Sequence, residues 1–157
     1  AAQTAQLIAK AASAPLFPWA GLSEVCMGAF QGLTRQEARE RYPEASAAYF
    51  SDQAHVAPPG GESMLDLQSR ALHALSEIEL DAQGCARIAV VSHGALLKTL
   101  LCAVAGMPLT CFGRIDVSNG SISVIECAKD TRRLITLNDI SHFGDPYEEM
   151  SATRLMI

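Results

Sequence analysis

The chain has 157 residues, a formal net charge of −5, and a composition that is 49% hydrophobic and 18% charged. This length and composition predict one globular domain with a sizeable core and not a disordered chain. The 12 Lys and Arg side chains are scattered along an acidic sequence, which argues against a nucleic-acid-binding protein. The longest apolar run, Ala95 to Ala105, is interrupted by Lys98 and is shorter than the roughly 20 residues of a membrane-spanning helix. We therefore expect neither a nucleic acid nor a membrane as a partner.

The cysteines and the N-terminus bear on the cellular compartment. The sequence opens at Ala1 without an initiator methionine, and no basic segment followed by an apolar one predicts a secretion signal. The 5 cysteines are an odd number without a C-x-x-C pair, which fits neither a disulfide framework nor a zinc site. They are Cys26, Cys85, Cys102, Cys111 and Cys127. We expect buried, reduced thiols in a cytoplasmic protein.

The first third of the chain predicts helices separated by loops. Residues 3–12 have a helical composition, and the following segment, "SAPLFPW", contains the prolines that end the helix. Thr34 is followed three residues later by Glu37, which is a capping-box pattern. A short helix is therefore expected over residues 34–41, restarting after Pro43.

A longer helix, a buried strand and a further helix are expected next. Ser63, with Asp66 at the third position, is the expected N-cap of the longer helix. An apolar stripe at three- and four-residue spacings marks its buried face: Met64, Leu67, Ala71, Leu75 and Ile78. Residues 88–91 form a continuous, β-branched apolar run typical of a strand buried on both faces of a parallel sheet. The next helix, residues 94–105, is expected to end at Gly106.

The closing segments complete the prediction of the fold. "SISVIEC" (121–127) and "RRLITLND" (132–139) alternate apolar and polar residues, which predicts a hairpin with one buried face. Helices around a buried strand, followed by a hairpin, predict an α/β protein: a three-layer α/β/α sandwich with a mostly parallel, mixed sheet. Residues 1–157 are expected to form a single domain. Only residues 88–91 have the pattern of a central strand, and a parallel strand needs a neighbour to satisfy its backbone groups.

His93 directly follows the expected buried strand, in the sequence Ser92-His93-Gly94. Open α/β sheets bind ligands at the carboxyl ends of their strands, where loops converge and unpaired helix N–H groups favour negative charge. An imidazole at this place can donate hydrogen bonds to a phosphoryl oxygen, and Gly94 lets a ligand approach the backbone. The alternative is a purely structural histidine, and the Ser-His-Gly motif alone does not decide between the two.

Glu24 is the second informative residue. It lies in an apolar segment, "GLSEVCMGAF", with no cation within four residues. A carboxylic acid that is buried without a partner has a raised pKa, and such an acid can donate a proton near neutral pH. An exposed loop acid is the equally weighted alternative.

Other nucleophiles and ligands are less well supported. Ser92 is not expected to be a nucleophile, because adjacent side chains point in different directions and the G-x-S-x-G elbow is absent. His55 is expected in an exposed loop and His73 on a helix surface. His142 has two alternatives, to cap the sheet or to reach the site. No pair of these side chains has metal-ligand spacing on one helix, so a metal site is not expected.

Six segments match, in the same order, the motifs of one known family. "AAQTAQLIA" is similar to its R-A-x-Q-T-A helix, and "LSEVCMGAFQGLTRQEARERYPE" to its L-x-E-x-x-x-G segment with the Tyr-Pro turn. "PPGGESMLDLQSR" is similar to its P-G-G-E-S helix start and "VVSHGALLKTLL" to its second histidine motif. "SNGSISVIE" and "LNDISHF" are similar to its closing hairpin and tail. Across nearly its whole length, the chain resembles the histidine phosphatase superfamily, the phosphoglycerate-mutase-like proteins.

The resemblance implies phosphoryl transfer through a phosphohistidine, without metal or cofactor. Glu24 takes the place of the family's proton donor, and His93 that of the second histidine, which stabilises the transferring phosphoryl group. Gly94 and Asn119 are the further candidates for phosphate binding. The expected ligand is a small phosphorylated metabolite or inorganic phosphate, since an acidic surface disfavours polyanions. A phosphatase is favoured over a phosphoglycerate-type mutase, because the segment from Glu24 to Gly60 offers few basic residues to hold a bisphosphorylated cofactor.

The sequence departs from the family at one point, because it contains no Arg-His-Gly motif. In the family this motif ends the first strand and supplies the nucleophilic histidine, and a second arginine precedes the residue equivalent to Ala1. A strand and its crossover, roughly 30 residues, are therefore expected to be missing, including the central neighbour of residues 88–91. Three explanations remain open: an N-terminal part outside these residues, a natural short form that serves as a non-catalytic binding module, or a homodimer or other partner that supplies the strand.

Overall fold

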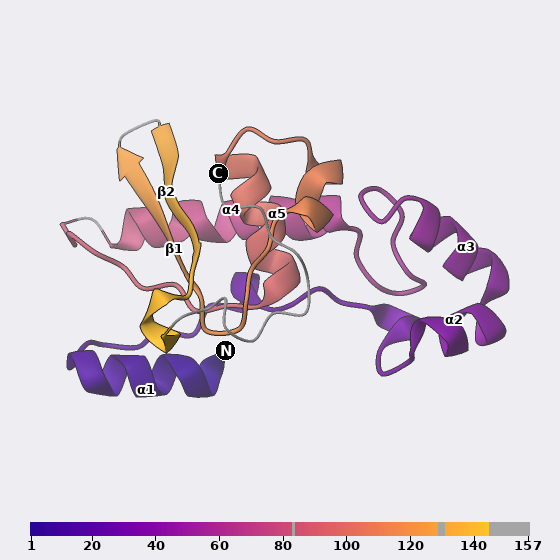
Figure 1. Ribbon diagram of the computed structural model, residues 1–157, viewed down its shortest axis with the longest axis horizontal. Helices are drawn as coiled ribbons and strands as arrows, with labels where there is room; N and C mark the ends of the chain where they lie inside the picture. The colour runs from indigo at the N-terminus through magenta and orange to yellow at the C-terminus, as the bar shows by residue number, and fades with distance from the viewer. Residues whose placement is uncertain (83, 129–130, 145–157) are drawn as a thin grey trace.

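The computed structural model describes residues 1–82, 84–128 and 131–144 (Figure 1). The helices are α1 (Ala2–Ala12), α2 (Arg35–Arg41), α3 (Pro43–Ser51), α4 (Met64–Asp81) and α5 (Gly94–Val104). Short 3₁₀ helices are η1 (Ala20–Leu22), η2 (Gly28–Phe30), η3 (Leu109–Arg114) and η4 (Ser141–Phe143). The strands β1 (Ile122–Ala128) and β2 (Thr131–Asp139) follow α5. Within the described residues no helix is both long and apolar enough to cross a membrane.

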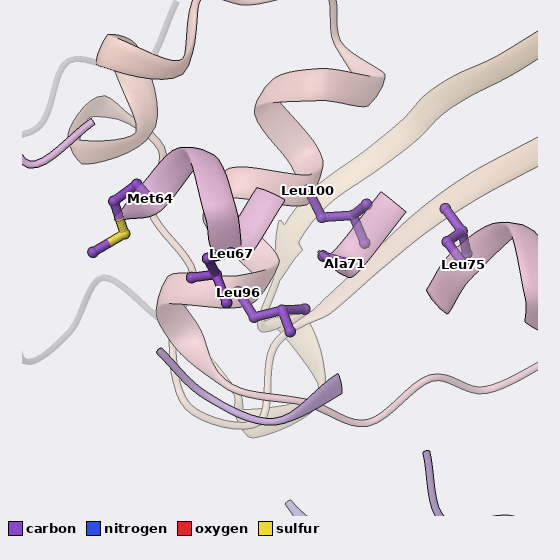
Figure 2. Close-up of a cluster of buried hydrophobic side chains, with 6 residues drawn as sticks. All are labelled: Met64, Leu67, Ala71, Leu75, Leu96 and Leu100. Atoms are coloured by element: carbon purple, nitrogen blue, oxygen red, sulfur yellow. The ribbon is translucent and has the colours of Figure 1, made fainter. Parts of the chain in front are cut away.

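The main core lies between α4 and α5 (Figure 2). The predicted stripe of α4 is confirmed, since all five of its residues are buried, and Leu96 and Leu100 of α5 pack against it. Full burial of one such leucine stabilises the fold by about 1.5–3 kcal/mol. The start of α4 is also as predicted: Ser63 and Asp66 form a capping box. The packing of these two helices places the N-terminus of α5 relative to the rest of the chain.

A second, smaller cluster joins α2 and α3 at one end of the molecule (Figure 1). Phe30, Ala38 and Tyr49 are its buried members. The predicted capping box of Thr34 and Glu37 starts α2, and α3 starts at Pro43. The helix predicted over residues 3–12 is likewise present as α1.

The predicted hairpin is confirmed, because β1 and β2 pair as antiparallel strands. Ile125 and Leu134 of its inner face pack against Leu101 and Ile115. The opposite face stays open to solvent, with Ile135 53% exposed. The hairpin therefore covers the C-terminal half of α5 with one face only.

The prediction of a buried parallel strand at residues 88–91 is wrong for this structure. These residues belong to no strand, and Ile88 is 48% exposed. The α/β class holds, but the described residues form only a two-stranded antiparallel sheet, not the predicted three layers around a mostly parallel sheet. An apolar run becomes a strand only where a neighbour accepts and donates its backbone hydrogen bonds, and no described segment does so here.

The prediction of buried thiols is also wrong for most of the cysteines. Cys102 is buried and Cys111 is half-buried, whereas Cys26, Cys85 and Cys127 are exposed. All of them are free of disulfides. Cys102 lies on the face of α5 that packs against η3 and the hairpin, which explains its burial.

Candidate active site

Glu24 and His93, predicted from separate segments, meet at the N-terminus of α5. The Glu24 carboxylate accepts hydrogen bonds from the backbone nitrogens of Ala95 and Leu96, each at 3.2 Å. It also accepts one from the backbone nitrogen of Val25 at 2.9 Å. His93 is the N-cap residue of α5, with extended backbone angles. The two candidate residues therefore share one helix terminus.

The electrostatics of this terminus suit an anion. The first N–H groups of a helix lack intrahelical partners and carry a partial positive charge, which stabilises a nearby negative group by about 0.3–1 kcal/mol. Glu24 is half-buried and bonded to three backbone N–H groups. It is thus neither the unpartnered buried acid nor the exposed loop acid that the sequence suggested. Instead, it is anchored to the helix that begins beside His93.

Gly94, the first residue of α5, lies at the open side of this terminus. A Cβ atom built at Gly94 would meet no atom within 4 Å, so the space beside its backbone is free, as ligand approach requires. Ser92 is engaged elsewhere, because its hydroxyl donates to the carbonyl of Leu22 at 2.8 Å. This bond ties the segment before Glu24 to the segment before α5.

Asn119 is placed differently from the other candidates. It lies in the exposed turn before β1, next to Ser118, whose backbone nitrogen donates to the Asn138 side chain at 2.7 Å. Among the described residues, no hydrogen bond joins Asn119 to Glu24 or His93. The structure therefore places Glu24, His93 and Gly94 at one helix terminus and shows no hydrogen bond of Asn119 with them among the described residues.

The remaining histidines lie on the surface. His55 is exposed and pairs with Asp52 at 2.9 Å, which helps to hold the pKa of that carboxyl below its ordinary value. His73 is exposed beside Glu77, as predicted for a helix-surface residue. His142 is exposed with its ring 4.1 Å from that of Phe143. In the described ranges no group of three or more His, Cys, Asp or Glu side chains is arranged to hold a metal ion.

Two residues that no sequence pattern singled out hold the segment that carries Glu24. Arg70, on α4, donates to the backbone carbonyls of Gly21 and Ser23 at 2.8 and 3.0 Å. Arg70 also pairs with Glu62, at 2.7 Å between Nη2 and Oε1. Both residues belong to the "PPGGESMLDLQSR" segment. The similarity of this segment to a family motif was the one feature of the sequence that could have pointed to them.

A cavity of about 410 Å³ lies between α4, α5 and the hairpin, but it is not part of this site. Its lining includes Val104, at the C-terminal end of α5, and the ion pair of Glu79 with Arg132. Glu24 and His93 are at the N-terminal end of the same helix. The candidate site therefore lies apart from this cavity.

Comparison with protein families shows which family the chain belongs to. The family model of the histidine phosphatase superfamily (branch 1) matches residues 1–140. The chain belongs to this superfamily, as the six sequence motifs predicted.

Individual relatives in the superfamily are phosphatases and a mutase. Phosphoserine phosphatase 1 of Hydrogenobacter thermophilus is 28% identical over 146 residues, 93% of this chain and 69% of that protein. A metal-independent phosphoserine phosphatase of Arabidopsis thaliana is 32% identical over 146 residues, 92% of this chain and 59% of that protein. A 2,3-bisphosphoglycerate-dependent phosphoglycerate mutase of Methylorubrum extorquens is 30% identical over 111 residues, 70% of this chain and 52% of that protein. The chain thus spans only part of the length of each relative.

A solved structure shares the fold. Bacillus stearothermophilus YhfR superposes with a TM-score of 0.81 at 29% identity, over 90% of this chain and 70% of that one. The described helices and hairpin therefore have the arrangement found in a histidine phosphatase fold.

Proposed function

We propose that this protein is a phosphatase that hydrolyses a small phosphorylated metabolite through a phosphohistidine. The observation that carries the proposal is the meeting of Glu24 and His93 at the N-terminus of α5. A carboxyl group, an imidazole and the positive end of a helix dipole at one place suit a reaction in which charge develops on phosphoryl and leaving-group oxygens. The phosphoserine phosphatases among the relatives support this reaction class.

Each site residue has a role in this reaction. The nucleophilic nitrogen of a histidine attacks phosphorus, the bond from phosphorus to the leaving oxygen breaks, and Glu24 gives its proton to that oxygen. Water then attacks the phosphorus of the phosphohistidine, the Glu24 carboxylate takes a proton from the water, and the N–P bond breaks to release inorganic phosphate and the free histidine. His93 donates a hydrogen bond to a phosphoryl oxygen at the exposed Gly94 side of the terminus. The nucleophilic histidine belongs to an Arg-His-Gly motif, which the proposal places N-terminal to Ala1.

The substrate class follows from charge and from the relatives. The net charge of −5 disfavours a polyanionic substrate, and the named substrate of two relatives is a small phosphomonoester. The similarity to a phosphoglycerate mutase makes phosphomutase the second candidate. Phosphatase is preferred because a mutase needs basic side chains to hold its bisphosphorylated cofactor, and the segment from Glu24 to Gly60 offers few. Two of these, Arg35 and Arg39, lie over the Phe50 ring, 4.5 and 5.7 Å from its centroid. A cytoplasmic location is part of the same proposal.

The experiment compares variants of a form that carries the Arg-His-Gly segment before Ala1. Glu24→Gln is expected to lower kcat for phosphoserine or an aryl phosphate by about 100-fold or more, since general acid catalysis contributes roughly 10²–10⁴-fold. Inhibition by inorganic phosphate should change by less than about threefold, because the amide keeps the shape of the side chain. Glu40→Gln is the control, since Glu40 is exposed and accepts a hydrogen bond from the Gln36 side chain on the same helix. An unchanged kcat in Glu24→Gln would remove Glu24 from the mechanism.

Assays of the same active form distinguish the phosphatase proposal from the mutase alternative. Release of inorganic phosphate from phosphoserine without a bisphosphorylated cofactor is the expected result. Conversion of 3-phosphoglycerate to 2-phosphoglycerate that needs 2,3-bisphosphoglycerate, without phosphate release, would instead establish the mutase.

A further inference from the structure

The guanidinium of Arg70 has a partner for every N–H group that it carries. Nη1 donates to the carbonyls of Gly21 and Ser23, at 2.8 and 3.0 Å. Nη2 donates to the carbonyl of Glu24 at 3.4 Å and to Glu62 Oε1 at 2.7 Å. Nε donates to Glu62 Oε2 at 3.3 Å. An arginine has five such donors, so one side chain of α4 binds three carbonyls of the segment that leads to the candidate acid.

Glu62 holds the other end of this segment. Its Oε1 accepts from the backbone nitrogen of Cys26 at 2.8 Å, and its own backbone nitrogen donates to the carbonyl of Cys26 at 2.9 Å. A Cβ atom on Gly61 would lie 2.5 Å from the same carbonyl, so the two backbones meet closely at this point. Glu24 is thus held on one side by Arg70 and on the other by Glu62.

Arg70 and Glu62 affect Glu24 through the backbone of its segment and not through its carboxylate. The side chains of Arg70 and Glu62 are only 28% and 17% exposed, and the one contact of Arg70 with Glu24 is to its carbonyl, not to its carboxylate. The Glu24 side chain is left free to reach the nitrogens of Ala95 and Leu96. A displacement of the segment would therefore move the carboxylate away from α5 without changing its chemistry.

We infer that Arg70 and Glu62 are positioning residues, which set the backbone of residues 21–26 so that the Glu24 carboxylate lies at the N-terminus of α5 beside His93. This inference rests on the proposed function, since it assigns Glu24 a role in turnover. A lysine cannot replace Arg70, because an ammonium is a point charge with three donors and lacks the planar fork. A misplacement of about 1 Å can lower a catalytic rate by roughly 100-fold.

A double-mutant cycle on the active form tests the inference. Arg70→Lys is expected to lower kcat by about tenfold or more, with KM and inhibition by inorganic phosphate changed by less than about threefold. In a Glu24→Gln background the same substitution should have no further effect on kcat, because residues that act through one another are not additive. Glu62→Gln is the milder second variant, since it keeps an acceptor for the Cys26 nitrogen but loses the charge.

The control is a matched ion pair that joins Glu79 of α4 to Arg132 of β2. Arg132 donates to both carboxylate oxygens of Glu79, at 2.9 and 2.7 Å, with side chains 26% and 28% exposed. Arg132→Lys should lower stability by a similar amount and leave kcat unchanged. Equal losses of kcat in Arg70→Lys and Arg132→Lys, or an undiminished effect of Arg70→Lys in the Glu24→Gln background, would overturn the inference.

Amide hydrogen exchange in the 157-residue chain gives a readout that does not depend on activity. Arg70→Lys should raise the exchange rates of the Cys26, Ala95 and Leu96 amides, and Arg132→Lys should not. Unchanged protection of these amides in Arg70→Lys would refute the positioning role. If Glu24→Gln leaves kcat intact while Arg70→Lys loosens these amides, the proposed function fails and the structural part of the inference stands.

Discussion

The backbone nitrogen of Leu96 lies 3.2 Å from the Glu24 carboxylate, although the two residues are 72 positions apart in the sequence. This contact depends on the packing of α4 against α5 and on the segment that Arg70 holds. The candidate site therefore forms only in the folded chain. Substitutions in the site and substitutions elsewhere in the fold are expected to affect activity, stability and thiol reactivity differently.

The 157 residues by themselves are expected not to hydrolyse an aryl phosphate, because they contain no Arg-His-Gly motif to supply the nucleophile. The measurement is p-nitrophenyl phosphate turnover, together with a search for acid-labile phosphohistidine. Turnover that disappears in His93→Ala but survives in the surface control His73→Ala would contradict this expectation.

Gly61→Ala is expected to destabilise the fold, because its Cβ would lie 2.5 Å from the Cys26 carbonyl. Overpacking of this kind costs about 1–3 kcal/mol of unfolding free energy. Gly113→Ala is the control, since a Cβ there meets no atom within 4 Å. Urea denaturation of both variants checks the prediction, which is wrong if their midpoints coincide.

Stability should fall at acid pH partly through Glu79. Its hydrogen bonds from Arg132 hold the pKa of this carboxyl below the ordinary value of 4.5. Because the folded-state pKa is the lower one, the contribution is fully present above pH 4.5 and is lost as the pH falls through the folded-state value. Melting temperatures between neutral and acid pH should therefore decline less steeply in Glu79→Gln than in the parent chain.

The control for this pH dependence is Glu126→Gln. Glu126 pairs with Arg133, but both side chains are largely exposed, at 54% and 68%. Exposed pairs of this kind contribute little to stability. A curve for Glu126→Gln that flattens as much as that for Glu79→Gln would show that the hydrogen bonds from Arg132 to Glu79 are not the cause.

Cys127 should react slowly with iodoacetamide although it is exposed. Burial of its sulfur and the neighbouring Glu79 raise the pKa of the Cys127 thiol to about 11. At pH 8 little of it is thiolate, so alkylation should be at least roughly tenfold slower than at exposed Cys26. Mass spectrometry of alkylation over time checks this, and equal rates would contradict it. Glu79→Gln should speed the reaction of Cys127.

Local elements were predictable from the sequence because their signals are local. The capping boxes at Thr34 and Ser63 and the buried stripe of α4 depend on spacings of three and four residues. The hairpin depends on alternation, and it formed as predicted. By contrast, the apolar run at residues 88–91 predicted a strand that the structure does not contain. A strand forms only beside another strand that pairs with it, and the local sequence does not show whether such a partner is present.

By itself, the sequence determined the helices, the hairpin and the family motifs, and it proposed Glu24 and His93 as candidate site residues. Only the tertiary structure decided that Glu24 is anchored to α5, that Asn119 has no bond to either residue, and that Arg70 and Glu62 hold the acid in place. The physical reason is that Arg70 binds the carbonyls of Gly21 and Ser23. Every residue has a carbonyl, so no side-chain pattern marks these two as partners, and only the packing of the helices brings them within hydrogen-bond distance.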